Sequence, residues 1–467
     1  KKKSEIDLDK RFYTFVGYNN SGKTYISQII WYLFSGFEIA FQLPSNLIIE
    51  KEKDKSFEFD ISAVLQSFQT AFKKNCLDLL GIDDQENIFI EIQRIIHANS
   101  FTTPFFSSLD DNIITEYYTF IKSPNSNIVK INLITLESPL TLDEFNRQFA
   151  KGFSYNVKLW IHENDHIQNI KRYISKMLFK YIPSAFLIFL PATRSFLPSY
   201  YKYLSEGYEN EREQIGEIIR KNPNDVERIK FLTKKRHTSA VNQLLNKIND
   251  LSSKSEVNPV YLDLVKDLEN LMQGSIAVQN VEGIANSEFG FKVNDQTTLE
   301  MYQTSTSVSQ LTMLYLYFKY WTAEDHNFLI IDEPEENLHP ENQIKLLDIL
   351  VRFANRNNNR VLLTTHSPLM AEAVNNHAHL SLLHEKGEDV AKIISEHHLA
   401  ITPIDKNDKN PLKHSDYATY FFNGEQIKEY PMTDFGVFFR DFKEAEEKVS
   451  DTANILKGYI YNAQKKK

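Results

Sequence analysis

The sequence has little cysteine, no long apolar run and no excess of positive charge. Cys76 is the only cysteine among 467 residues, which excludes a disulfide within the chain and favours a cytoplasmic location. No run of about 18 apolar residues occurs, so a membrane span is not expected. The formal net charge of −9 argues against coating nucleic acid through bulk charge, although a local basic groove stays open.

Short apolar runs alternate with helical patterns, which predicts an α/β fold with a mainly parallel sheet. The expected strands of this sheet are Arg11–Val16, Phe186–Leu190, Phe328–Asp332 and Arg360–Thr365. From Gly274 onward, turn residues and alternating apolar positions predict an additional antiparallel β part.

The length predicts two or three structural units. Helical spacing of apolar residues predicts a large, mainly helical insertion after the first strand and helix. A charged stretch further on predicts an antiparallel pair of helices that project as an arm. The expected division is 1–57 and 273–467 for the two parts of the core, 58–185 for the insertion, 186–199 for a core strand and linker, and 200–272 for the arm.

A glycine-bearing segment lies between the first predicted strand and a helix that begins near Gly22. It matches G-x-x-x-x-G-K-[ST] with Gly17, Tyr18, Asn19, Asn20, Ser21, Gly22, Lys23 and Thr24. Glycines let the backbone approach a phosphate, and the amides at the start of the helix point toward it. We expect Lys23 to contact the β- and γ-phosphates of ATP and Thr24 to offer its hydroxyl to Mg²⁺.

Two later apolar strands end in residues suited to phosphate chemistry. Asp332 and Glu333 follow the strand that starts at Phe328. We expect Asp332 to hold Mg²⁺ and Glu333 to orient and polarise the attacking water. His366 ends the next strand, and the same edge of a parallel sheet would bring it close to the γ-phosphate.

These motifs together resemble ABC-type ATPases of the SMC/RecF/OLD lineage. The likeness rests on residues 17–24, on 332–340 (DEPEENLHP) and on 365–368 (THSP), and covers roughly residues 1–40 and 270–440. It implies an ABC-type P-loop NTPase core, a D-loop at Asn337–His339 and a switch role for His366. Pro191–Arg194 and the tail around 420–436 resemble stand-alone anti-phage ATPases, PtuA-like proteins of Septu and retron systems. Arg194 would then touch nucleotide or couple the arm to the site, and an ordinary surface arginine is the alternative.

The family places a signature motif with Ser-Gly before the acidic strand, where it binds the γ-phosphate held by the opposite subunit. Thr304–Gln310 occupies this place, and Ser305 and Ser307 are the expected nucleotide contacts. Ser307 stands where a glycine is expected, which predicts slow hydrolysis. A plain serine N-cap would give the same pattern.

The resemblance implies an ATPase that forms a homodimer or higher homo-oligomer with ATP and Mg²⁺ at the subunit interface. It further implies a role in anti-phage defence through a separate effector protein, most simply a nuclease. One alternative is a DNA-repair or chromosome-maintenance ATPase that clamps DNA, so contact with nucleic acid stays open. Another is a scaffold that binds ATP structurally and barely hydrolyses it.

Overall fold

The computed structural model describes a subset of the chain. The described residues are 4–35, 48–51, 56–60, 62–63, 66–67, 70, 113–122, 128–141, 144, 187–201, 238–252, 254–280, 287–405, 408 and 410–464. They fall into two compact units, one formed by residues 1–31 and 182–467 and the other by residues 32–181. Within the described residues, no helix is both long and apolar enough to cross a membrane.

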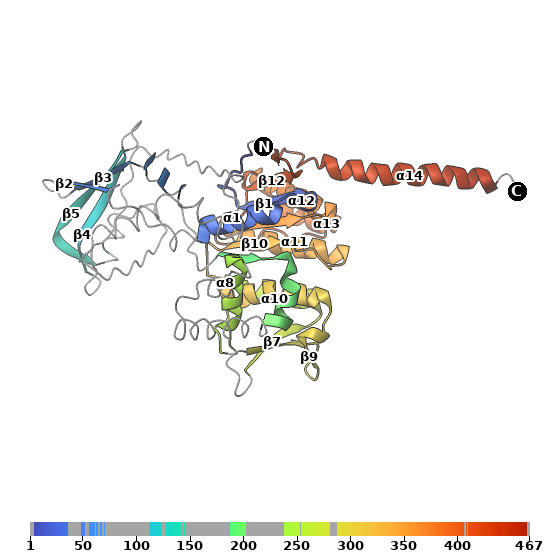
Figure 1. Cartoon of the computed structure of the whole chain (residues 1–467), viewed down its shortest axis with the longest axis horizontal. Coiled ribbons are helices and arrows are strands. Elements are labelled where there is room, and N and C mark those ends of the chain that lie inside the picture. The colour runs from blue at the N-terminus through green and yellow to red at the C-terminus, as the bar shows by residue number, and fades with distance from the viewer. Residues whose placement is uncertain are drawn as a thin grey trace, which may run out of the picture. The chain divides into compact units, whose positions relative to one another are not determined.

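The first unit is built around a six-stranded sheet in the order β13-β12-β1-β11-β10-β6 (Figure 1). Its strands are β1 (Phe12–Gly17), β6 (Leu187–Leu190), β10 (Phe328–Asp332), β11 (Arg360–Thr365), β12 (Tyr417–Phe422) and β13 (Ile427–Tyr430). All neighbours pair in parallel except β12 and β13, which are antiparallel. This confirms a mainly parallel α/β core, and each of the four strands expected for it is present within one residue.

The parallel strands are mostly apolar because both faces of the sheet are covered. Every residue of β1 and of β10 is buried. Helices connect the strands, as parallel pairing requires. They are α1 (Lys23–Ser35), α11 (Pro340–Asn355), α12 (Pro368–Glu385) and α13 (Val390–His397), and α14 (Arg440–Gln464) follows the last strand.

A second group of elements packs against this core. It contains the antiparallel sheet β7 (Ser275–Asn280), β8 (Ser287–Lys292) and β9 (Thr298–Glu300), with helices α8 (Ser239–Asn249), α9 (Leu262–Met272) and α10 (Thr306–Leu316). The antiparallel part expected after Gly274 is therefore present. Leu244 of α8, Leu268 of α9 and Leu314 of α10 are buried in the same hydrophobic core as Leu329 of the main sheet.

This packing corrects the expected arm over residues 200–272. Residues 238–272 do not project, because the apolar faces of α8 and α9 are buried in the core. Charged residues dominate the composition of this stretch, so the apolar residues that α8 and α9 bury were not recognised as a core-facing stripe. Residues 202–237 of the expected arm lie outside the described residues.

The second unit contains a sheet that the mainly helical insertion expected over residues 58–185 did not include, and much of that range lies outside the described residues. The sheet is four-stranded and antiparallel, in the order β2-β3-β5-β4. The strands are β2 (Ile48–Lys51), β3 (Ser56–Asp60), β4 (Ile113–Lys122) and β5 (Ile128–Thr141). β4 and β5 are rich in Ile, Thr, Tyr and Phe, which favour strands. β2 and β3 also lie in this unit, so the expected boundary at residue 57 falls too late.

Candidate functional site

The segment Gly17–Thr24 connects the end of β1 to the start of α1, as the motif predicts. Gly17 has φ +143°, and a Cβ atom there would lie 2.1 Å from the carbonyl oxygen of Phe422 on β12. Gly22 has φ +97°, which L side chains rarely adopt. Two positions of the loop therefore require glycine, one for close approach to β12 and one for backbone conformation.

The rest of the loop is open to a ligand. Asn19 and Asn20 are exposed, and Asn20 adopts a left-handed conformation with φ +57°. The hydroxyl of Ser21 is buried and makes no hydrogen bond. The first turn of α1 has amides with no partner inside the helix, and such amides bind anions. The loop thus offers donors without acceptors where a phosphate group would lie.

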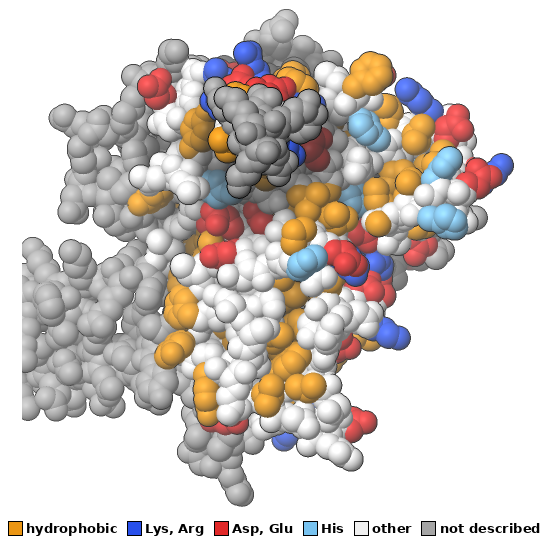
Figure 2. Space-filling view, turned by 90° about the vertical axis from the view of Figure 1, so that its right-hand side faces the viewer, with side chains coloured by type: hydrophobic (Ala, Val, Ile, Leu, Met, Phe, Trp, Pro, Cys, Tyr) orange, Lys and Arg blue, Asp and Glu red, His pale blue; other side chains and the backbone are white. Residues whose placement is uncertain are grey.

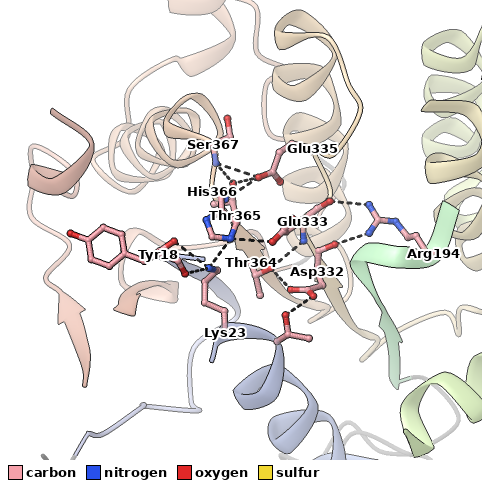
Figure 3. A network of polar contacts seen from close by, with 12 residues as sticks. Tyr18, Lys23, Arg194, Asp332, Glu333, Glu335, Thr364, Thr365, His366 and Ser367 are labelled. Carbon is pink, nitrogen blue, oxygen red and sulfur yellow. Dashed lines mark hydrogen bonds and ion pairs between the residues drawn. The ribbon is translucent and has the colours of Figure 1, made fainter. Parts of the chain in front are cut away.

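Lys23 folds its ammonium group back over the loop. Nζ lies 3.2 Å from the carbonyl oxygen of Gly17, 3.0 Å from that of Tyr18 and 2.9 Å from Nε2 of His366 (Figure 3). Burial lowers the pKa of Lys23, and the nearby carboxylates of Glu333 and Asp332 oppose that shift. The ammonium group is therefore a desolvated cation held by weak neutral acceptors.

Thr24 and Asp332 bring a hydroxyl and a carboxylate together beside the loop. The Thr24 hydroxyl donates to Oδ2 of Asp332 over 2.7 Å, and the Thr364 hydroxyl of β11 donates to Oδ1. Asp332 is 3% exposed. Hydroxyl and carboxylate oxygens are the ligands that Mg²⁺ prefers, and it completes its shell with water and substrate phosphate oxygens. The donor set of this pair therefore fits Mg²⁺.

Glu333 and His366 face each other where β10 and β11 end. Nε2 of His366 lies 3.1 Å from Oε1 of Glu333. The hydrogen bond from His366 lowers the pKa of Glu333, and the charges of Lys23 and Arg194 act in the same direction. Glu333 is thus held as a carboxylate, the form needed to accept a proton.

The backbone of Glu333 is strained at the turn that follows β10. Its φ is +46°, an uncommon conformation for a residue with a side chain. The amide donates to both the carbonyl and the hydroxyl oxygen of Thr364, each over 3.1 Å. Strained residues of this kind cluster at functional sites.

Glu335 is a site residue whose role could not be foreseen from the motif. Its Oε1 accepts hydrogen bonds from the Thr365 hydroxyl and from the amides of His366 and Ser367, at 3.1 and 3.3 Å for the two amides. Glu335 therefore holds the loop that carries His366. Burial raises the pKa of Glu335, and its Oε2 is buried without a partner.

Arg194 lies next to this centre, and the structure excludes the surface arginine that was the alternative for it. Its side chain is 1% exposed, so it is not a surface arginine. Its guanidinium group donates to the backbone carbonyl oxygens of Asp332 and Glu333, at 2.6 and 3.2 Å. Burial lowers the pKa of Arg194 to about 10, so the group keeps its charge at neutral pH.

The segment Thr304–Ser309 lies at the start of α10, as predicted. Ser305 is exposed and caps the helix by accepting from the amide of Val308 at 3.4 Å. The hydroxyls of Ser305 and Ser307 lie 2.8 Å apart. In the described part of the chain, no hydrogen bond joins these two serines to residues 17–24. The structure thus shows the N-cap function of Ser305.

Comparison with known families adds the decisive observation. The sequence profile described as "AAA ATPase domain" matches residues 1–371, well over half of the chain. The chain belongs to the AAA ATPase domain family. The matched range contains all of the motif residues that meet in Figure 3, from Lys23 to His366. No curated protein matches the chain significantly in sequence.

Solved structures similar to this AAA ATPase domain protein include SMC head domains. One derives from Pyrococcus furiosus, has an extended coiled coil and is bound to the C-terminal domain of ScpA. It is 12% identical in sequence, the comparison covers 95% of this chain and 94% of that chain, and the TM-score is 0.29. Another SMC head is bound to the winged-helix domain of ScpA, with 13% identity, coverage of 80% and 87%, and a TM-score of 0.28. A third, from Thermotoga maritima, has 12% identity, coverage of 79% and 86%, and a TM-score of 0.23.

Proposed function

We propose that this AAA ATPase domain protein is an ABC-type ATPase of the SMC/RecF/OLD lineage that binds and hydrolyses ATP at a dimer interface. One observation carries the proposal. Five residues predicted from separate motifs meet in one place, with Thr24 on Asp332 and with Lys23 and Glu333 on the same atom of His366. A phosphate loop, a hydroxyl and a carboxylate suited to Mg²⁺, and a second carboxylate that can act as a base are the parts that an ATPase site needs. Motifs without a shared function would not be expected to bring these parts together.

The chain's own residues divide the work. The loop amides and Lys23 would bind the β- and γ-phosphates, since Lys23 already lies over the loop with only neutral acceptors. Thr24 and Asp332 would hold Mg²⁺, which neutralises phosphate charge when bound. Glu333 would accept a proton from the attacking water, and its lowered pKa keeps it ready to do so. His366 would contact the γ-phosphate and keep the Glu333 carboxylate in place.

A second subunit would complete the site. Ser305 and Ser307 are at the start of α10, where hydroxyls and helix amides suit an anion, and Ser305 is exposed. Within the described residues, the hydroxyls of Ser305 and Ser307 bond to each other and the Ser305 hydroxyl caps α10, with no hydrogen bond to residues 17–24. We infer that they contact the γ-phosphate held by a partner copy of the chain, which makes hydrolysis depend on dimerisation.

ATP occupancy would then switch the assembly between states and control a separate effector. We propose that this effector is a nuclease and the setting bacterial anti-phage defence in the cytoplasm, as the likeness to PtuA-like proteins of Septu and retron systems suggests. A DNA-clamping repair ATPase is the second candidate. On the face drawn in Figure 2, the described Lys and Arg side chains lie among acidic side chains and do not form a continuous basic surface.

Glu333→Gln tests the proposal. The variant keeps the fold and the loop but removes the proton acceptor, so we expect ATP to stay bound and the dimer to persist, with hydrolysis at least about 100-fold slower. Light scattering coupled to gel filtration and steady-state ATPase rates provide the measurements. Glu396→Gln on α13, where the side chain is 57% exposed, is the matched control and should equal the wild type.

Lys23→Ala separates binding from catalysis. The substitution removes the cation that lies over the carbonyl oxygens of Gly17 and Tyr18, so nucleotide affinity should fall by at least about 10-fold.

An ATPase rate unchanged in Glu333→Gln would contradict the catalytic proposals and favour a scaffold that binds ATP structurally. Salt-sensitive, ATP-dependent DNA binding by the wild type without a partner would favour the repair function.

A further inference from the structure

Arg194 is a fully buried cation that the nucleotide chemistry does not use directly. It lies in a short 3₁₀ turn (Ala192–Phe196) that directly follows β6. Its guanidinium group hydrogen-bonds backbone carbonyls, and no carboxylate forms an ion pair with it within the described residues. Burying a cation is costly unless each donor finds an acceptor.

Every N–H of this guanidinium group has an acceptor. Nε donates to the carbonyl of Gln310 at 3.1 Å, and Nη1 to the carbonyls of Pro191 and Asp332 at 3.0 and 2.6 Å. Nη2 donates to the carbonyl of Glu333 at 3.2 Å. The Gln310 amide, oriented so that its oxygen faces the guanidinium, accepts from Nη2 at 2.8 Å. Five donors in a rigid fork are a property of arginine alone.

The acceptors belong to the ends of the paired strands β6 and β10 and to helix α10, and Arg194 bonds to all three. Pro191 directly follows β6, and Gln310 lies in the first turns of α10. Asp332 ends β10 and Glu333 follows it, with Arg194 beside both (Figure 3). Gln310 is 0% exposed, whereas Ser305, five residues earlier on the same helix start, is exposed. Arg194 therefore connects the buried part of α10, at Gln310, to the end of β10.

The end of β10 is the place where such a displacement matters. Glu333 has the strained φ of +46°, so its backbone keeps this geometry only while neighbours hold it. Its amide donates to Thr364, and its carbonyl accepts from Arg194 and from the amide of Glu336, each over 3.2 Å. Loss of Arg194 would leave the carbonyl with the local Glu336 contact alone, so the turn could shift and move the carboxylate.

We propose that Arg194 is a positioning residue that transmits the engagement of the α10 start by a partner subunit to the carboxylate of Glu333. The inference deepens the proposed ATPase function and rests on it. When Ser305 and Ser307 bind the partner's nucleotide, α10 shifts, and the guanidinium group moves the Glu333 turn with it. Hydrolysis in one site thereby responds to occupancy of the interface by the other subunit.

Arg194→Lys is the primary test, because lysine keeps the charge but cannot reach three elements at once. We expect ATP affinity within about 2-fold of the wild type and kcat lower by about 10- to 100-fold, since a misplaced catalytic group costs this much. Arg352→Lys is the matched control. Arg352 joins α11 to Asp263 and Asp267 of α9, away from the site, so this variant should lower Tm without changing kcat.

Gln310→Met is a milder second variant in case Arg194→Lys folds poorly. It removes the side-chain acceptor of Nη2 and keeps the backbone acceptor of Nε, so we expect a loss of kcat of about 3- to 10-fold with ATP affinity retained. The loss of kcat in both variants should exceed any loss that Arg352→Lys produces at a similar Tm.

A double-mutant cycle distinguishes transmission from simple support. Ser307→Ala should slow the wild type and slow Arg194→Lys much less, because the link that conveys its effect is already broken. Additive losses of kcat would overturn the inference, as would a wild-type kcat in Arg194→Lys. Absence of ATP hydrolysis in the wild type would instead refute the proposed function, so the two failures are distinguishable.

Discussion

Glu335 provides the sharpest test of how the site is held together. Its Oε1 is the acceptor for the Thr365 hydroxyl, the His366 amide and the Ser367 amide. The Ser367 amide has a second acceptor in the Thr365 hydroxyl at 2.9 Å. Glu335→Ala therefore leaves two donors, the Thr365 hydroxyl and the His366 amide, without an acceptor in a site where Thr365 is fully buried.

The magnitude follows from these two orphaned donors. Each unsatisfied buried donor costs about 1–3 kcal/mol. Removing a buried carboxylate whose Oε2 has no partner recovers part of that cost. We expect Glu335→Ala to lower the free energy of unfolding by about 2–4 kcal/mol, which corresponds to a fall in Tm of about 3–6 °C for a unit of this size. The ATPase rate should fall by about 10-fold, because the loop that carries His366 loses its anchor.

Glu335→Gln separates the acceptor from the charge. The amide oxygen can still accept the hydrogen bonds made to Oε1, so the ATPase rate should remain within about 3-fold of the wild type. Burial raises the folded-state pKa of Glu335, so its contribution to stability is full below the unfolded pKa and is lost as pH rises through the folded pKa. Gln lacks this loss, and the Tm of Glu335→Gln relative to wild type should therefore rise between about pH 4 and about pH 8.

Calorimetry over that pH range, with ATPase rates at neutral pH, provides the assay. Equal Tm values for Glu335→Ala and wild type would refute the anchoring role. Glu335→Gln as slow as Glu335→Ala would refute the reasoning in another way, because it would show that the charge matters and the acceptor does not.

Two further substitutions probe the scaffold. In Gly17→Ala, the new Cβ would lie 2.1 Å from the carbonyl oxygen of Phe422, so we expect a loss of more than about 1 kcal/mol by calorimetry together with weaker ATP binding; wild-type values for both would contradict the close approach. Asp263→Asn removes the partner of Arg352 and Arg356, whose hydrogen bonds lower the pKa of Asp263 against the cost of its burial, and after discounting for solvent we expect a loss of about 1 kcal/mol at neutral pH. That stability is present above the unfolded pKa and vanishes as pH falls through the folded pKa, so a deficit that persists at low pH would count against the ion pair.

Local signals predicted the central part of the site. Each of its motifs can be recognised from a few neighbouring residues. These motifs are the glycine loop between a strand and a helix, and the acidic and histidine residues at the ends of apolar strands. Parallel pairing of β10 with β11, and of β11 with β1, then brings Asp332, His366 and Lys23 to one edge. The outcome could be inferred because carboxyl ends of parallel strands meet at the same edge.

Long-range contacts explain what the sequence did not reveal. Arg194 is 116 residues from Gln310 and 138 from Asp332, and nothing local indicates that it donates to their carbonyl oxygens. Strand β12 could be expected from its aromatic run, yet its pairing with β1 is set by the fold alone. The strands β4 and β5 were missed because helical spacing elsewhere in the same region outweighed their β-branched and aromatic residues.

Nε2 of His366, which both Lys23 and Glu333 contact, indicates how nucleotide binding would rearrange the site. Nε2 of His366 lies 2.9 Å from Nζ of Lys23 and 3.1 Å from Oε1 of Glu333. A ring nitrogen either accepts or donates, so Nε2 can serve the lysine or the carboxylate, but not both. A phosphate group that draws Lys23 toward the loop would release Nε2 to donate to Glu333. Binding would thereby order the base, and the interface at α10 would position it through Arg194, so that ATP alone leaves the site half-organised and slow.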